Sequence, residues 1–568
     1  MRTSRLVAHA AIAGLLLSSS VIGAPIALAQ LPVVSNVNAS TITQDHGSLT
    51  IHKRLNPESY GTNPTGTQAD VASAKGDPVE GVPFQIHKVT SFQLDGNAED
   101  TDLNSNEGYA KANKFAQEYA KAENKREFLA QYATLDEGSS QTKTTNGAGE
   151  AKFDNLPLGL YLVEELSAAD YPTTIKVNGE EINGVIAPSA PYLVFLPMTD
   201  PTDGSKWNFD IHSVPKNSSV GIDKKIEDYQ ENKGYNAGDV LKYTINTDIP
   251  RVEPGQTIRG YEISDTLPKE VTFTDANLAN LVVEIEGAQL ANGVDYTVEG
   301  VNTPQVRIVF TAEGFNKLLQ NGGKKVKVTL PATINTPEVA DVDVADTPDP
   351  KGNDGTDVND GVAVNRAVLT FTNDAGYRAE VESNSVKSRW GNLRILKTDP
   401  QKANSGEAAL DGAKFELYRC ADQDTPLGDK ITINGKSEWT SGEDGTKGLI
   451  NIKGLQVTDL LNNESIANGE EAKYCLKETK APEGYELSPK MHVIDFKEED
   501  LDNADPVTIA GVQVDNDRIT QTAEVVNVTK SSSFLPNTGG AGIGILMAIG
   551  AAIIGAGLWA AKRMNRKA

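Results

Sequence analysis

The chain has 568 residues, and its 78 acidic side chains outnumber 53 lysines and arginines, which gives a formal net charge of −25. An acidic surface of this kind argues against nucleic acid as a partner. The six histidines are scattered, and no nucleophile paired with a base, HExxH sequence or phosphate loop stands out. Composition and motifs therefore give no support for an enzyme and predict no cofactor.

The first residues have the organisation of a secretory signal peptide. Arg2 and Arg5 precede the apolar run Leu6–Leu17, and Ala27-Leu28-Ala29 offers a small-x-small cleavage site. We expect residues 1–29 to be removed and the remainder to be exported; an N-terminal membrane anchor is the alternative. About 500 exported residues of ordinary apolar content predict three or four domains.

Most of the exported part reads as β-strands. Apolar and polar residues alternate between clusters of Gly, Pro, Asn and Asp, which predicts β-sandwich domains; examples are residues 220–226, 239–249, 362–371 and 393–397. The exception is Glu107 to Tyr132, where apolar residues recur at helical spacing. We expect one amphipathic helix there, inserted into the first domain.

Three similar first strands indicate three domains. Each ends in a lysine on the same face as two preceding apolar residues, and the lysines are Lys53, Lys224 and Lys397. The predicted boundaries are 30–217, 218–390 and 391–530, followed by a spacer and C-terminal signal over 531–568. The Asp-rich stretch 341–360 is expected to be a solvated loop of the second domain; its spacing fits no EF-hand, and calcium binding there stays open.

Two cysteines, Cys420 and Cys475, occur in a chain expected to reach an oxidising compartment. A disulfide between them is favoured over two free thiols or a metal site. In the chain-entropy model, a disulfide that closes a loop of this length stabilises the folded chain by about 4 kcal/mol.

Alternation points the three strand-end lysines into domain cores, where an unpaired charge costs several kcal/mol. In the third domain Glu478 and Asn527 fall into the same inward register as Lys397. Burial lowers a lysine pKa and raises a carboxyl pKa, so a neutral amine beside a protonated acid could attack the asparagine carboxamide and release ammonia. The sequence thus predicts an intramolecular isopeptide bond.

Residues 474–485, from Tyr474 to Tyr485, match the E-box YxLxETxAPxGY, and the third domain therefore resembles the CnaB domains of Gram-positive pilins. The second domain resembles a CnaA-type domain, in which an Asp replaces the Glu. Register there predicts Lys224, Asp265 and Asn365, with Asn373 and Asn384 as alternative partners. Residues 159–165 form a degraded E-box, so Lys53, Glu165 and Asn217 are candidates for a third bond that related pilins do not always have.

A strand near the end of the first domain resembles the pilin motif WxxxVxVYPK. Trp207, Ile211, Pro215 and Lys216 fit the motif, whereas Ser213 and Val214 depart from it. The resemblance implies that Lys216 accepts the sorting-signal carbonyl of another subunit. Alternation predicts that Lys216 is exposed while Asn217 is buried; an ordinary surface lysine is the alternative.

The C-terminal residues Leu535, Pro536, Asn537, Thr538 and Gly539 match the LPxTG sorting signal of Gram-positive bacteria. An apolar run over 541–561, about long enough to cross a bilayer, and the basic residues 562–567 follow. The resemblance implies that a sortase cuts between Thr538 and Gly539 after transient anchoring in the membrane; an ordinary membrane anchor is the alternative.

These features appear in the order found in the SpaA-type major pilins of actinobacteria, which the chain resembles over its whole length. The resemblance implies a mostly β chain of three tandem Ig-like domains (CnaB-like, CnaA-like, CnaB-like) in a surface fimbria that supports adhesion. It also implies partners: a class C sortase, a housekeeping sortase, other copies, minor pilins and peptidoglycan. The alternative is a monomeric wall-anchored adhesin or a minor pilin, and no residue names a receptor.

Overall fold

The structure is a computed structural model that describes residues 38–529 with internal gaps at 56–64, 123–124, 167–173, 182–184, 187, 202, 231–232, 253–256, 339–360, 375, 377, 404, 468–472, 502–504 and 528. The predicted signal peptide (1–29), the Asp-rich stretch 341–360 and the sorting signal with its apolar run all lie outside the described residues. No helix within the described part is long and apolar enough to cross a membrane.

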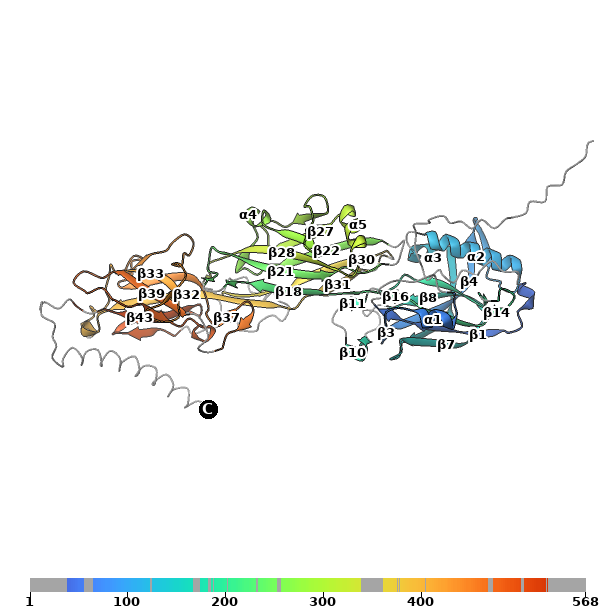
Figure 1. Cartoon of the computed structure of the whole chain (residues 1–568), viewed down its shortest axis with the longest axis horizontal. Helices are drawn as coiled ribbons and strands as arrows, with labels where there is room; N and C mark the ends of the chain where they lie inside the picture. The colour runs from blue at the N-terminus through green and yellow to red at the C-terminus, as the bar shows by residue number, and fades with distance from the viewer. Residues whose placement is uncertain are drawn as a thin grey trace, which may run out of the picture. The chain divides into compact units, whose positions relative to one another are not determined.

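The chain divides into two compact units, Met1–Gly391 with Lys453–Glu471, and Asn392–Ile452 with Ala472–Ala568. Strands dominate the regular structure in both units (Figure 1). The prediction of a mostly β chain is confirmed, while the three domain boundaries stay a prediction.

The N-terminal region of the first unit contains several small sheets. Their strands are β1 (His46–His52), β2 (Arg54–Leu55), β3 (Asp77–Glu80), β4 (Pro83–Leu94), β5 (Asn97–Asp100), β6 (Ala133–Thr144), β7 (Glu150–Pro157), β8 (Gly159–Glu165), β9 (Lys176–Val177), β10 (Glu180–Glu181), β11 (Val185–Ile186), β12 (Tyr192–Leu196), β13 (Met198–Thr199), β14 (Trp207–Asn208), β15 (Asp210–Ser213), β16 (Lys216–Asn217) and β17 (Ser219–Val220). The sheet orders include β15-β1-β7, β10-β9-β3-β2-β16 and β12-β8-β4-β5.

Strands from the two ends of this region lie side by side and run parallel. β1 pairs with β15 through Leu49↔Ile211, and β2 pairs with β16 through Leu55↔Asn217. Parallel neighbours need a long connection between them, and here nearly the whole region supplies it. Strands from near the start and near the end of this region are therefore held in register beside one core.

Two helices, not one, occupy the predicted helical insertion. α2 (Asn106–Lys121) buries Ala112, Phe115, Ala116 and Tyr119, and α3 (Lys125–Tyr132) follows. The prediction of a continuous helix is wrong because the backbone is extended at Ala122, and Lys125 Nζ donates to the carbonyls of Ala120 and Ala122, both at 2.7 Å. A lysine at this position satisfies carbonyls left open at a helix end.

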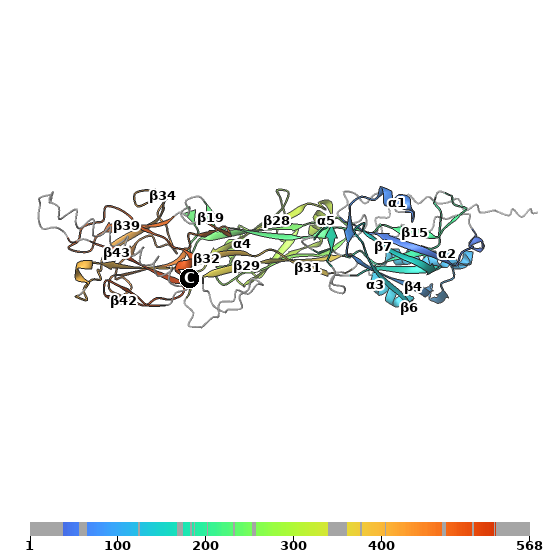
Figure 2. The same ribbon diagram turned by 90° about the horizontal axis from the view of Figure 1, so that it is seen from below.

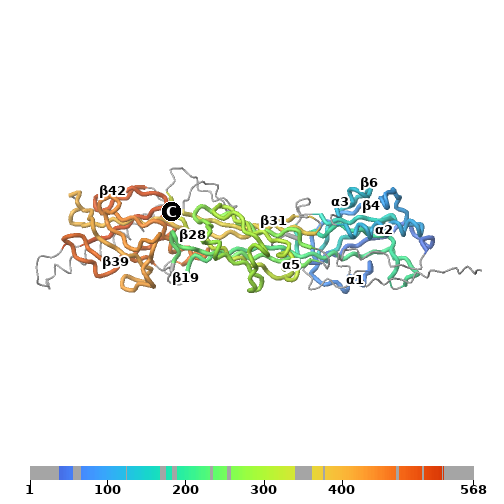
Figure 3. The backbone as a smooth tube through the Cα atoms, turned by 90° about the horizontal axis from the view of Figure 1, so that it is seen from above, coloured from blue at the N-terminus to red at the C-terminus, as the bar shows by residue number. Residues whose placement is uncertain are grey.

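The helices lie on different sides of the N-terminal region. Figure 1 shows α2 and α3 beside strand β4. Figures 2 and 3 show the short helix α1 (Gln68–Ser73) on the side away from α3 and β6. The remaining helical segments are η2 (Ala39–Thr41), α4 (Asp275–Leu278), α5 (Ala312–Gln320), η3 (Pro400–Lys402) and η4 (Glu498–Asp500).

The rest of the first unit contains two main sheets, ordered β18-β21-β28-β24-β25 and β26-β27-β22-β30-β31. Their strands and neighbours are β18 (Ile222–Glu227), β19 (Tyr229–Gln230), β20 (Lys233–Gly234), β21 (Val240–Asp248), β22 (Ile258–Thr266), β23 (Val271–Thr272), β24 (Val282–Ile285), β25 (Ala288–Gln289), β26 (Tyr296–Glu299), β27 (Gln305–Phe310), β28 (Lys325–Ile334), β29 (Val362–Asn365), β30 (Ala367–Asn373), β31 (Arg378–Glu382), β37 (Leu460–Leu461) and β38 (Glu464–Ser465). Tyr261, Ile263 and Asp265 are buried at alternate positions of β22, which places the Asp265 carboxyl in the core.

The second unit contains the remaining strands. They are β33 (Lys414–Cys420), β34 (Pro426–Leu427), β35 (Trp439–Thr440), β39 (Lys473–Lys480), β40 (His492–Ile494), β41 (Val507–Ile509), β42 (Val512–Val514) and β43 (Thr520–Val526), with the C-terminal part of β32 (Val386–Thr398) and the N-terminal half of β36 (Leu449–Gln456). β32 pairs parallel with β43 from Asn392↔Thr520 to Thr398↔Val526. As in the N-terminal region, strands from near the start and near the end are neighbours.

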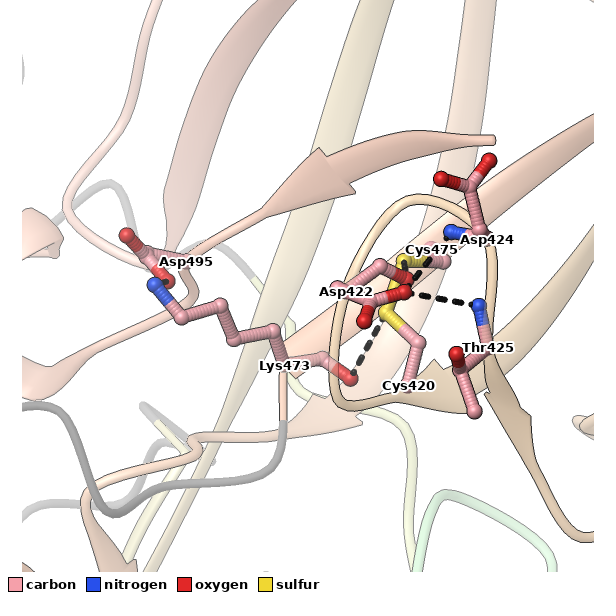
Figure 4. Close-up of a disulfide and its surroundings, with 7 residues drawn as sticks. All are labelled: Cys420, Asp422, Asp424, Thr425, Lys473, Cys475 and Asp495. Carbon is pink, nitrogen blue, oxygen red and sulfur yellow. Dashed lines mark hydrogen bonds and ion pairs between the residues drawn. A yellow bond between two sulfur atoms is a disulfide. The ribbon is translucent and has the colours of Figure 1, made fainter. Parts of the chain in front are cut away.

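Cys420 and Cys475 form a disulfide, as predicted, with their Cα atoms 5.9 Å apart (Figure 4). The two residues lie on the antiparallel neighbours β33 and β39, where Cys420 pairs with Lys473 and Tyr418 with Cys475. Directly after Cys420, the Asp422 carboxylate accepts main-chain hydrogen bonds from Asp424 and Thr425 at 2.9 and 2.8 Å. The disulfide therefore joins residues 55 positions apart in the sequence, at the point where the chain turns back after β33.

We expect the double substitution Cys420→Ala, Cys475→Ala to lower the free energy of unfolding of the second unit by roughly 2–4 kcal/mol, because the unfolded chain regains loop entropy. Denaturant unfolding of the exported chain, followed by a probe in this unit, measures the change. Reduction of the wild-type chain should reproduce it. An unchanged transition midpoint in both cases would contradict the expectation.

Candidate functional site

Lys53, Glu165 and Asn217 meet in what we call the N-terminal trio. Lys53 directly follows β1, Glu165 ends β8, and Asn217 ends β16. Lys53 Nζ lies 2.7 Å from Glu165 Oε2, and Asn217 Nδ2 donates to both carboxylate oxygens at 3.1 Å. All three residues are buried, the lysine completely. The structure thus brings together the three residues that alternation placed on inward positions.

Lys224, Asp265 and Asn365 form the middle trio. Lys224 Nζ donates to Asp265 Oδ2 and lies 4.4 Å from the centre of the Tyr243 ring. Asn365 is completely buried and close enough to lower the pKa of Asp265, against the larger upward effect of burial. Within the described part of the chain, neither the oxygen nor the nitrogen of the Asn365 carboxamide has a partner at hydrogen-bonding distance and angle. Such a buried, unsatisfied amide needs an explanation.

The two alternative asparagines of the middle trio have other partners. Asn373 Nδ2 donates to the Pro188 carbonyl at 2.9 Å. The Asn384 carboxamide binds the main chain of Lys224, accepting from its N–H at 3.0 Å and donating to its carbonyl at 2.9 Å. This geometry favours Asn365 as the group that faces the lysine amine.

Lys397, Glu478 and Asn527 form the C-terminal trio. Lys397 Nζ donates to Asn527 Oδ1 at 2.5 Å and lies 3.3 Å from Glu478 Oε1. The lysine is on β32, Glu478 is on β39, and Asn527 directly follows β43. The lysine and glutamate side chains have no solvent exposure. The amine is therefore in contact with the amide and close to the acid, out of water.

Burial disfavours the charged forms of these groups. It lowers the pKa of Lys224 and of Lys397 to about 8, in each case against the upward effect of the neighbouring carboxyl. It also raises the pKa of Asp265. The lowered lysine pKa favours the neutral amine, and the raised carboxyl pKa favours the neutral acid. A neutral lysine amine is a nucleophile, and a buried carboxylic acid can donate a hydrogen bond to an amide carbonyl.

Two serines that sequence reasoning missed hold the glutamates of the outer trios. The Ser189 N–H and hydroxyl both donate to Glu165 Oε2, at 2.9 and 2.7 Å. The Ser488 N–H donates to Glu478 Oε2 at 2.7 Å. Neither serine lies in the inward register of a strand, so no sequence signal could have found them.

Lys216 lies on β16, where it pairs with Arg54. Its side chain is half-buried, whereas the next residue, Asn217, is 7% exposed. The Trp207 indole, which begins the same motif, donates to Thr41 Oγ1 at 3.0 Å. The proposed donor residue Thr538 lies outside the described residues. Within those residues, no cluster of His, Cys, Asp and Glu could hold a metal ion.

Comparisons with known proteins agree with these features. A family model described as Gram-positive pilin subunit D1, N-terminal domain, matches residues 44–218, and one described as a prealbumin-like fold domain matches residues 391–506. The chain is 32% identical to the type 2 fimbrial subunit of Actinomyces naeslundii over 578 aligned positions, covering 97% of this chain and 95% of that protein. It is 27% identical to the type 1 fimbrial subunit of Actinomyces viscosus, covering 96% and 95%.

Among solved structures, the full-length major pilin SpaD from Corynebacterium diphtheriae is similar with a TM-score of 0.61 and 26% identity, covering 87% of this chain and all of that one. The strand-rich units and these matches define a structural surface protein. The chain belongs to the family of Gram-positive pilins, the fimbrial subunits, and is a subunit of a pilus shaft of the SpaA type.

We expect the variant Asn527→Ala, which keeps Lys397 as an amine, to become more stable as the pH rises from about 8 to 10.5. The folded-state pKa is about 8 and the ordinary value is 10.5, so the unfolded chain binds more protons in this window. The difference corresponds to about 3 kcal/mol at most.

Denaturant unfolding at several pH values measures this gain, with Asn527→Ala, Lys397→Met as the control that lacks the titrating amine. The two variants should diverge across the window. Parallel stability curves would contradict the lowered pKa.

Proposed function

We propose that this chain is the repeating unit of a covalent pilus, in which a sortase joins Thr538 of one subunit to Lys216 of the next. The observation that carries the proposal is the half-buried Lys216 directly before the buried Asn217, on a strand whose motif resembles the pilin motif. The Asn217 side chain faces the core, while the neighbouring Lys216 side chain faces the other way and is accessible to an enzyme. Head-to-tail joining is a heterologous, open contact and builds a filament.

The joining reaction follows from the sorting signal. A class C sortase cuts the bond between Thr538 and Gly539 and holds the threonine as an acyl group, and the Lys216 amine of another copy then takes it over. The membrane-anchored C-terminal segment leaves at the cut. A housekeeping sortase ends growth by transfer to a peptidoglycan amine, and minor pilins join the shaft by the same chemistry.

We propose further that each trio forms a Lys–Asn isopeptide bond. The lysine amine attacks the asparagine side-chain carbonyl carbon, a C–N bond forms, the bond to the amide nitrogen breaks, and ammonia leaves with a proton from the amine. Asp265, Glu165 or Glu478 polarises the carbonyl and relays that proton. The burial, the contacts and the lowered lysine pKa values support this reaction.

The bonds would join strands that bear load. In the N-terminal trio Lys53 directly precedes β2 and Asn217 ends β16, and these two strands pair in parallel. In the C-terminal trio Lys397 is on β32 and Asn527 directly follows β43, and these two strands also pair in parallel. Pulling on the two ends of such a domain shears this strand pair. A covalent bond across it stops the sheet from separating under force.

We expect Lys216→Ala to abolish the shaft. Boiled surface fractions of the wild type should give a ladder of high-mass bands on a denaturing gel, and the variant should give monomer. Lys206→Ala, which removes an exposed lysine of the same region, is the control and should keep the ladder. Monomer alone in the wild type would instead indicate a wall-anchored adhesin, and a ladder in Lys216→Ala would show that another lysine is the acceptor.

We expect the intact mass of the exported chain to be lower than its sequence mass by three ammonia molecules, apart from the two hydrogens of the disulfide. Glu165→Ala, Asp265→Ala and Glu478→Ala should each restore one ammonia, because each removes the acid of one trio. Asn365→Ala should also restore one, while Asn373→Ala should not. A wild-type mass equal to that of the unmodified sequence would refute the internal bonds.

A further inference from the structure

The main chain of the lysine is held on both sides in each outer trio. The Lys53 N–H donates to the Gly149 carbonyl at 2.7 Å, and the Val79 N–H donates to the Lys53 carbonyl at 3.3 Å. In the C-terminal trio, Lys397 donates to Gly448 at 2.9 Å and accepts from Leu410 at 2.9 Å. Neighbouring backbone thus fixes the residue that carries the amine.

The two glycines in these contacts are required for steric reasons. Both have a positive φ, 76° at Gly149 and 72° at Gly448. A Cβ at Gly149 would lie 2.6 Å from the Lys53 carbonyl oxygen, and one at Gly448 would lie 3.0 Å from that of Lys397. A glycine at each position therefore lets the loop before β7 approach Lys53 and the loop before β36 approach Lys397.

In the middle trio, one side chain takes the place of both backbone partners. Lys224 is on β18, at the edge of its sheet, and pairs with Ile245 of β21 on one side. On the other side the Asn384 carboxamide accepts from the Lys224 N–H at 3.0 Å and donates to the Lys224 carbonyl at 2.9 Å. The amide imitates the hydrogen-bond pair that a neighbouring strand would provide.

Asn384 also connects the lysine to the strand of its reaction partner. The preceding residue, Ser383, is bound to Ala367 twice: its N–H donates to the Ala367 carbonyl at 2.9 Å, and its hydroxyl accepts from the Ala367 N–H at 3.0 Å. Ala367 lies two residues after Asn365. A short chain of hydrogen bonds therefore fixes the lysine backbone relative to the segment that presents the carboxamide.

We propose that Asn384 is a positioning residue for the middle-trio bond: it fixes the Lys224 backbone so that the amine reaches the Asn365 carbonyl carbon. The proposal rests on the isopeptide reaction proposed above. Attack requires the two atoms to approach to about 3 Å with defined alignment, and a misplacement of about 1 Å can cost a hundredfold in rate. Asn384 itself is solvent-exposed, so its replacement leaves the core packing in place.

The test follows ammonia loss at the middle trio by mass spectrometry after pulse-labelled synthesis of the exported chain. We expect Asn384→Ala to slow the loss by on the order of ten- to a hundredfold. Asn384→Gln, which keeps both amide groups, should recover part of the rate. Asn373→Ala is the matched control and should react at the wild-type rate, as should the C-terminal trio in every variant.

A second measurement separates positioning from stability. In the unreactive Asp265→Ala background, Asn384→Ala should shift the unfolding transition by too little to account for the slower reaction. Reaction of Asn384→Ala at the wild-type rate, an equal rate for the Ala and Gln variants, or a stability loss that explains the whole effect would each overturn the proposal. Absence of the middle bond in the wild type, with the C-terminal bond present, would instead refute the isopeptide reaction at the middle trio.

Discussion

Both units are organised around lysine amines that have no access to water. Strand alternation points Lys53, Lys224 and Lys397 into the cores, where a lone ammonium would cost several kcal/mol. Each amine is next to a carboxyl group, and in two trios burial lowers the lysine pKa to about 8. The surrounding strands must hold amine, acid and amide in one place, and the parallel pairing of β2 with β16 and of β32 with β43 brings the lysine and asparagine positions of the outer trios close together.

Much of the site follows from the period of two residues in a strand. Lys397, Glu478 and Asn527 share inward faces with apolar neighbours, so they can meet if their strands line one core, and the strand register places them in contact. The disulfide and the mostly β fold were predictable for similar reasons, from two cysteines in an exported chain and from alternation. The family resemblance added roles for Lys216 and Thr538 that no periodicity supplies.

Other features depend on contacts between distant segments and could not be predicted. Strand register favours Asn365 over Asn384, but the hydrogen bonds between the Asn384 carboxamide and the main chain of Lys224 have no signal in the sequence. The break near Ala122 depends on where Lys125 folds back onto the end of α2. Ser189 and Ser488 contact the glutamates through main-chain N–H groups, and Ser189 also through its hydroxyl, but neither serine lies in the strand register from which the trios were predicted.

The most direct test of the account is tandem mass spectrometry of branched peptides from a reduced, proteolysed sample of the exported chain. The account predicts three branched peptides, which join Lys53 to Asn217, Lys224 to Asn365 and Lys397 to Asn527, each lighter than the sum of its two arms by one ammonia. Linear peptides with intact lysines and asparagines at all six positions would contradict it. That result would mean that the buried trios are held by hydrogen bonds and ion pairs alone.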